Sequence, residues 1–83
     1  MGRIIDGSSM NMVGSNVKKF RRLNKLSQQQ LSDQLELLAV YICRGSISRI
    51  EDKSRTVTDI ELYGLSKVLN VAIEELFEKT DEM

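Results

Sequence analysis

The sequence predicts an all-α protein with a single domain, and three features support this prediction. Ser27 and Gln30 can form a capping box, in which each side chain accepts a hydrogen bond from the backbone amide of the other residue. Thr58 and Glu61 repeat the arrangement. Apolar residues recur at helical spacing and the chain contains no proline. A chain of 83 residues is long enough for one modest core.

A first helix is expected to begin near Ser15 or Asn16, because both residues are capable N-caps. Val17, Phe20 and Leu23 then form an apolar stripe. The basic residues of this segment are left to face solvent, except Arg21, which falls on the inward side.

The second and third helices are joined by a short connection. Leu31, Leu35 and Leu38 follow the Ser27 box at spacings of four and three, so they predict one buried stripe. The apolar residues within 36–41 are expected to lengthen this helix and to pack the turn. The third helix begins after Cys43, at the N-cap position, and has Ile47 and Ile50 to bury.

Two further helices are expected after the Thr58 box. The buried face of the fourth comprises Ile60, Leu62, Leu65, Val68 and Leu69, with Tyr63 at its margin. Asn70 can end it in the left-handed conformation. A short fifth helix follows the cap position Ala72 and contains Ile73, Leu76 and Phe77.

The motifs L-S-Q-Q-Q-L-S-D-Q-L, I-S-R-I-E and V-x-x-x-E-L-F occur here in that order, between residues 26 and 77. Together they resemble the Xre-like helix-turn-helix domains of phage-repressor and Cro type, and the resemblance covers residues 13–77. The resemblance implies a compact five-helix bundle whose second and third helices form the helix-turn-helix. It also implies a DNA-binding transcriptional regulator, a repressor without catalytic activity, that binds an inverted-repeat operator as a homodimer. The connection between helices 2 and 3 is five residues longer than is usual, which identifies a long-turn variant and leaves the angle between these helices open.

The resemblance places the third helix in the major groove, where an arginine fork can match the O6 and N7 atoms of guanine. The expected base contacts are Arg44, Gly45, Ser48 and Arg49. The expected phosphate contacts are Gln28, Ser46, Lys53, Arg55, Arg22 and Lys25.

Arg21 and Glu51 are expected to form a structural ion pair, as the resemblance implies, that holds the first helix against the third. Two nearby residues, Cys43 and Gly45, each have two possible explanations. Cys43 is either an oxidisable thiol at a helix N-terminus or a small residue tolerated at a cap. Gly45 allows close approach either to a neighbouring backbone or to DNA.

The composition excludes most catalytic chemistry. The chain has no histidine and one cysteine, so it lacks the ligands of a zinc site and the base of a nucleophilic triad. No metal, cofactor or enzymatic activity is expected. No apolar run approaches the roughly 20 residues that span a bilayer, and a cytoplasmic location is expected.

The formal net charge is zero, but the charges are segregated along the chain. Residues 13–55 carry nine basic and four acidic side chains, whereas residues 56–83 carry two basic and seven acidic ones. This distribution suits a domain that presents a basic end to DNA. It also suits two solvated faces that attract each other.

Residues 1–12 are expected to form a flexible arm, residues 13–78 the DNA-binding domain and residues 79–83 an acidic tail. Homodimerisation is expected either through the C-terminal helix, with Leu76 and Phe77 partly exposed, or only on DNA. The alternative function is a protein-interaction module of the same fold, such as an antitoxin or antirepressor. The zero net charge favours this alternative, whereas Arg44, Arg49 and Gln28 favour DNA.

Overall fold

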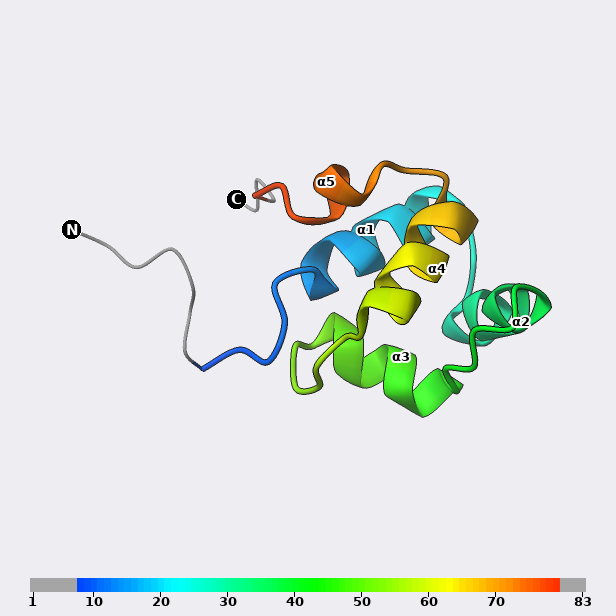
Figure 1. The fold of residues 1–83 in the computed structure, drawn as a ribbon, viewed down its shortest axis with the longest axis horizontal. Coiled ribbons are helices and arrows are strands. Elements are labelled where there is room, and N and C mark those ends of the chain that lie inside the picture. The colour runs from blue at the N-terminus through cyan, green and yellow to red at the C-terminus, as the bar shows by residue number, and fades with distance from the viewer. Residues whose placement is uncertain (1–7, 80–83) are drawn as a thin grey trace.

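The computed structural model describes residues 8–79 and confirms the all-α fold (Figure 1). The five helices are α1 (Gly14–Leu23), α2 (Gln28–Leu37), α3 (Arg44–Glu51), α4 (Asp59–Leu69) and α5 (Ile73–Leu76). No strand occurs within residues 8–79. Helix α1 packs against α3, α4 and α5, and α2 packs against α3 and α4, so all five helices share one core. Its fully buried side chains include Leu31, Leu35, Ile47, Ile50, Leu65, Leu69, Leu76 and Val17.

Both capping boxes are present as predicted. Ser27 Oγ accepts from the amide of Gln30 at 3.0 Å, and Gln30 Oε1 accepts from the amide of Ser27 at 2.8 Å. In α4 the corresponding distances between Thr58 and Glu61 are 3.2 and 3.0 Å. Asn70 ends α4 in the left-handed conformation, with φ of 59°, which is also as predicted.

The predicted start of α1 is wrong. Ser15 and Asn16 lie inside the helix, and the first turn is capped by Asn11, whose Oδ1 accepts from the amides of Val13 and Gly14 at 3.0 and 2.8 Å. Asn16 is buried and donates to the carbonyls of Leu76 and Glu78 at 2.8 and 2.5 Å. It therefore fastens the end of α5 to α1.

Gly14 explains why the helix begins where it does. A Cβ atom at this position would collide with the carbonyl oxygen of Ile50 and would lie 3.0 Å from that of Glu51. Helix α1 thus starts in direct backbone contact with the end of α3, an approach that only glycine permits.

Three apolar residues expected in the core, Leu23, Leu38 and Ile60, are exposed. Leu23 in α1 is 66% exposed and Ile60 in α4 is 67% exposed. At 3.6 residues per turn, Leu23 lies about 120° round α1 from Val17, and Ile60 lies about 140° round α4 from Leu65. Their spacing in the sequence placed Leu23 and Ile60 on the apolar stripes of α1 and α4, but the buried part of each stripe is narrower than the spacing predicted.

The long connection between α2 and α3 also differs from its prediction. Helix α2 extends only to Leu37, and Ala39 leaves the helical region with φ of 62°. Val40 and Ile42 are buried, but Leu37 and Leu38 are exposed, Leu37 by 84%. Of residues 36–41 only Val40 is buried, so the insertion packs through this one residue and presents the others on the surface.

Helix α5 has the predicted position, but the burial of its residues differs from the prediction. Leu76 is fully buried, whereas Phe77 is 44% exposed. The expectation that Leu76 is partly exposed is wrong, because α5 lies against α1 and α4. The neighbouring Phe77 and Ile73 keep surface that a partner could cover.

Candidate nucleic-acid interface

Helix α3 presents a polar face on an apolar anchor. Ile47 and Ile50 are completely buried against the core. The four residues predicted to contact bases (Arg44, Gly45, Ser48 and Arg49) are all exposed. The structure therefore brings three side chains, those of Arg44, Ser48 and Arg49, together with the backbone of Gly45 on the outer face of one two-turn helix, as a groove-reading helix requires.

Gly45 loses one of its two explanations. The nearest atom to a Cβ built at this position is Arg49 Nη1, at 3.9 Å, so no neighbouring backbone approaches it. A side chain could be accommodated within this chain. The other reading, close approach to DNA, stays a prediction.

The N-terminal end of α3 carries Cys43 and Ser46. Cys43 occupies the N-cap position without a capping hydrogen bond, and its thiol donates to Ser46 Oγ at 3.4 Å. Hydrogen bonding with the Ser46 side chain lowers the pKa of the Cys43 thiol, and the backbone amide of Ser46 adds to the effect. Ser46 Oγ also accepts from Arg49 Nη2 at 3.2 Å. Ser46 is therefore engaged within the helix, and it helps to hold the guanidinium of Arg49.

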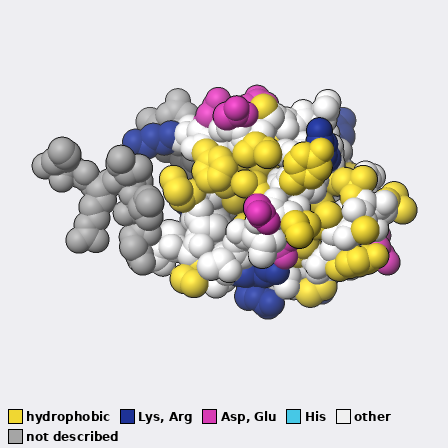
Figure 2. Space-filling model, viewed as in Figure 1, with side chains coloured by type: hydrophobic (Ala, Val, Ile, Leu, Met, Phe, Trp, Pro, Cys, Tyr) yellow, Lys and Arg dark blue, Asp and Glu magenta, His cyan; other side chains and the backbone are white. Residues whose placement is uncertain are grey.

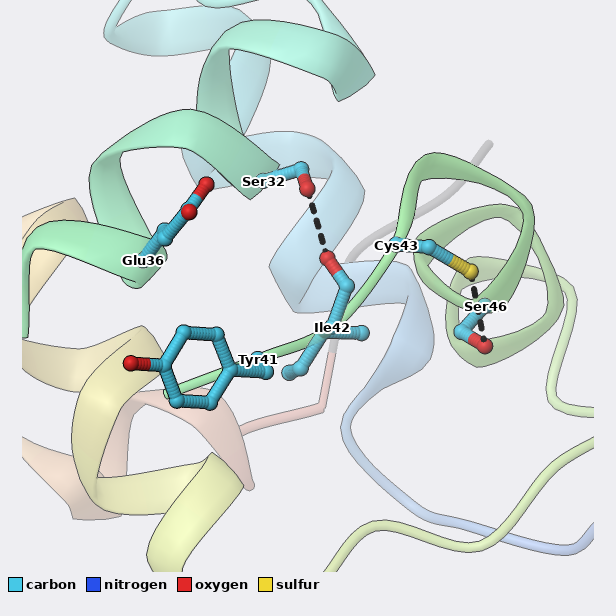
Figure 3. A pocket seen from close by; sticks show the side chains of 6 residues that line it. All are labelled: Ser32, Glu36, Tyr41, Ile42, Cys43 and Ser46. Carbon is cyan, nitrogen blue, oxygen red and sulfur yellow. Dashed lines mark hydrogen bonds between the residues drawn. The ribbon is translucent and has the colours of Figure 1, made fainter. Parts of the chain in front are cut away.

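An open hollow of about 430 Å³ lies beside this end of α3 (Figure 3). On one side, the Ser32 hydroxyl in α2 donates to the carbonyl of Ile42 at 2.6 Å and so ties the connection to α2. Tyr41 and Glu36 line the far side, and Cys43 and Ser46 the near side. The Ser32 contact fixes where α3 starts relative to α2.

Arg21, Glu51 and Gln28 form a hydrogen-bonded cluster that joins three helices. Arg21 donates to both carboxylate oxygens of Glu51, from Nε at 2.6 Å and from Nη2 at 3.1 Å, and both residues are buried. Gln28 Nε2 donates to Glu51 Oε1 at 3.0 Å. This is the ion pair that the family resemblance implied, and it also positions Gln28 at the start of α2. The third donor of Arg21 reaches the carbonyl of Leu26 at 2.8 Å.

The basic residues expected to contact phosphates differ in their exposure and in whether another residue of the chain already binds them. Arg22 and Lys25 are exposed, and Lys53 is half-buried after α3 with φ of 66°. Arg55 instead pairs with both oxygens of Glu61 at 2.9 Å, and this hydrogen bonding raises the pKa of Arg55. Arg55 therefore holds the loop after α3 to the start of α4 and has fewer donors left for a phosphate than Lys53.

Asn11 is a positioning residue that the sequence analysis missed. Besides capping α1, its Nδ2 donates to the carbonyls of Ile50 at 3.1 Å and Arg55 at 2.7 Å. The amide of Met10 donates to the carbonyl of Lys53 at 2.9 Å. Asn11 is itself a strong capping type, and this signal was passed over because residues 1–12 lack an apolar period. Residues 1–7 of that expected arm lie outside the described residues.

The comparison with known proteins gives the family. No family profile matches the chain. The chain is 38% identical over 65 residues to control protein C.SmaI of Serratia marcescens, an alignment that covers 78% of this chain and 71% of that protein. The chain belongs to the Xre-type controller proteins of restriction–modification systems.

As a controller protein, the chain is a DNA-binding transcriptional regulator of the helix-turn-helix type and not an enzyme. Within the described residues, no group of histidine, cysteine and carboxylate side chains is placed to hold a metal ion. None of the helices in residues 8–79 is long and apolar enough to cross a membrane.

Proposed function

We propose that this controller protein is a sequence-specific repressor that places α3 in the major groove of an inverted-repeat operator as a homodimer. The observation that carries the proposal is the exposure of Arg44, Ser48 and Arg49 on a helix locked by Ile47, Ile50 and Glu51. A rigid helix that presents two arginines can read guanine in the groove. On the family relationship, the controlled genes are those of a restriction–modification system and the protein works in the cytoplasm.

The phosphate contacts follow from this placement. Gln28 stands at the N-terminus of α2, where backbone amides favour anions, and Glu51 holds its side chain in place. Lys53 lies beyond the other end of α3, with Arg22 and Lys25 on α1 and its end as additional contacts. Ser46 and Arg55 contribute chiefly through the internal contacts that hold Arg49 and the loop after α3.

The same fold could serve a second function, as a protein-interaction module. The observation in its favour is the set of exposed apolar side chains away from α3, which includes Tyr63, Ile73 and Phe77. Homodimerisation on DNA accounts for this surface as well, so we place DNA binding first.

The test is selection from a pool of mixed-sequence duplex DNA at several salt concentrations, with sequencing of the retained fraction. Each neutralised phosphate contributes about −0.9 to the slope of log affinity against log salt. We expect a steep slope and an enriched inverted repeat. A flat salt dependence without an enriched sequence would favour the protein-interaction module.

A further inference from the structure

Helix α3 ends in a turn that carries Lys53. Lys53 has φ of 66°, in the left-handed region that a non-glycine residue rarely adopts. The amide of Lys53 donates to the carbonyl of Ile50 at 3.0 Å, and the amide of Ser54 donates to that of Arg49 at 2.9 Å. Such a conformation persists where surrounding contacts hold it in place. The contacts made to this turn by other parts of the chain therefore decide where the Lys53 side chain lies.

Asn11 holds the backbone on both sides of Lys53. Its Nδ2 donates to the carbonyl of Ile50 at 3.1 Å and to the carbonyl of Arg55 at 2.7 Å. Figure 1 shows the segment that leads into α1 beside the loop after α3. One side-chain amide thus joins the last turn of α3 to the residues that follow Lys53.

Two further contacts hold Lys53 itself. The amide of Met10 donates to the carbonyl of Lys53 at 2.9 Å. A Cβ atom built on Gly14 would lie 3.0 Å from Lys53 Cγ, so the aliphatic stem of the lysine lies against the start of α1. We call residues 10–14 the N-terminal clasp, because they hold both the backbone and the stem of Lys53.

The ammonium group of Lys53 is not used within the part of the chain that the structure describes. The ion pairs among the described residues join Arg21 to Glu51 and Arg55 to Glu61. Lys53 is half-buried, so its stem is held while its charged end remains available. A side chain whose stem is already ordered loses less rotamer freedom when its charge binds a phosphate.

We propose that the N-terminal clasp positions Lys53 for its phosphate contact, so that residues 10–14 contribute to DNA affinity without touching DNA. This inference rests on the proposed DNA-binding function and deepens it, because it gives the segment before α1 a role in that function. Asn11 acts as a positioning residue through Lys53. Its contribution is the same for all sequences, since phosphate contacts carry no sequence information.

The variant Asn11→Ser separates the two roles of Asn11. Its Oδ1 accepts from the amides of Val13 and Gly14, whereas its Nδ2 makes the two contacts with the loop after α3. Serine is about as good a cap as asparagine, so the start of α1 should be kept. The serine side chain is too short to reach the two carbonyls of the loop, and the substitution leaves the net charge unchanged.

The experiment titrates a random-sequence duplex with the full chain at several salt concentrations. Four proteins are compared: the unmodified protein, Asn11→Ser, Lys53→Ala and the double variant. We expect Lys53→Ala to reduce the steepness of log affinity against log salt by about 1. Asn11→Ser should reduce it in the same direction, by no more than this amount, and should have no further effect when residue 53 is already alanine.

Asn16→Ser is the matched control. Asn16 also donates to two carbonyls, those of Leu76 and Glu78, but these lie at the end of α5 and not in the loop after α3. This variant should leave the salt slope unchanged. An unchanged slope in Asn11→Ser would overturn the proposal. An equal reduction with lysine and with alanine at position 53 would also overturn it, because the effect would then not pass through Lys53.

A second measurement needs no variant. If the clasp promotes phosphate binding by Lys53, then phosphate binding must stabilise the clasp to the same extent. Hydrogen exchange of the Met10 amide, followed by NMR, should therefore slow when DNA is bound. An exchange rate that DNA does not change would contradict the proposal.

The unmodified protein separates this inference from the function on which it rests. Steep salt dependence and an enriched inverted repeat, with no effect of Asn11→Ser on the slope, would reject the clasp and retain the regulator. A flat salt dependence of the unmodified protein would reject both, because no phosphate contact would remain for the clasp to position.

Discussion

At the scale of single residues, Arg49 and Lys53 distinguish base reading from phosphate binding. Replacing Arg49 by alanine should cost about 1–3 kcal/mol on the specific site and little on random DNA. Replacing Lys53 should weaken binding to all sequences alike and should reduce the salt slope by about 1. Titration of specific and random duplexes at several salt concentrations measures both effects. Lys79→Ala, beyond α5, is the matched control, and equal losses of specificity at positions 49 and 53 would contradict these roles.

The buried carboxylate of Glu51 makes a prediction about stability. Its side chain is 4% exposed and accepts from Arg21 and Gln28. Glu51→Ala would leave Arg21 charged and buried without its partner, so the free energy of unfolding should fall by roughly 3–5 kcal/mol. Urea denaturation measures the change. The double variant Arg21→Met/Glu51→Met should recover part of this loss, because no uncompensated charge remains, and a double variant less stable than Glu51→Ala would contradict the account.

The thiol of Cys43 reports on the N-terminal end of α3. Hydrogen bonding with Ser46 lowers the pKa of Cys43, since it stabilises the thiolate. Ser46→Ala should therefore raise this pKa, and the pH profile of alkylation by iodoacetamide should move to higher pH. An unchanged profile would show that Ser46 does not contact the thiol in solution. Ser48→Ala, on the exposed face of α3, is the control and should leave the profile in place.

At the scale of elements, the end of α2 stores local strain at Ala39. This residue has φ of 62°, a conformation that costs a non-glycine residue roughly 1–2 kcal/mol. Ala39→Gly should thus raise the free energy of unfolding by about 1 kcal/mol, which thermal or urea denaturation can measure. Ala39→Ser is the control, because serine keeps a Cβ atom in the same left-handed conformation and should bring no gain. An equal gain from serine and glycine at position 39 would refute the explanation.

The elements show which parts of the fold sequence patterns can predict. Capping boxes and the left-handed Asn70 depend on residues within a few positions of each other, so they were predicted correctly. The start of α1 depends on Gly14 meeting the backbone of Ile50 and on Asn11 reaching the loop after α3. Such contacts join residues about 40 positions apart, and no local pattern encodes them. The exposure of Leu37 and Ile60 was not predicted for the same reason. Helical spacing shows which residues share a face of a helix, but not how much of that face the neighbouring helices cover.

The candidate interface also has one part that the sequence predicted and one part that it did not. The polar face of α3 follows from the spacing of Ile47 and Ile50, so its exposed residues were predictable. The pairing of Arg55 with Glu61 was not predicted, because Glu61 had already been assigned to the capping box. One carboxylate serves both contacts, and only the folded loop brings the guanidinium to it.

At the scale of the whole molecule, basic and acidic side chains are separated along the fold. The helices with an excess of basic residues are α1 and α3, and acidic residues gather over α4 and α5. In Figure 2, a group of acidic side chains lies at the top edge of the molecule and a group of basic side chains at the bottom edge, with further charged side chains of both signs elsewhere on the face. The zero net charge is therefore compatible with DNA binding, because the field near α3 is what a polyanion meets.

Dimerisation and DNA binding should be separable by a substitution far from α3. Tyr63 is 56% exposed on α4 and lines a hollow between α4 and α5. Tyr63→Glu would replace an aromatic ring, which Lys67 Nζ approaches to 5.0 Å, by a carboxylate that a dimer contact would desolvate, so association should weaken while the fold persists. Affinity for a full inverted repeat should then fall towards that for a single half-site, because the linked second contact raises affinity by roughly 10²–10⁴ when both half-sites are engaged.

Binding to duplexes with one and two half-sites measures this difference directly, and circular dichroism checks that the variant is folded. Leu23→Glu is the matched control, since Leu23 is an exposed leucine on α1 that does not line the hollow between α4 and α5. The control should keep the preference for two half-sites. If Tyr63→Glu kept it as well, α4 would not be the dimer contact, and the two α3 helices would have to be coupled through another surface or through the DNA alone.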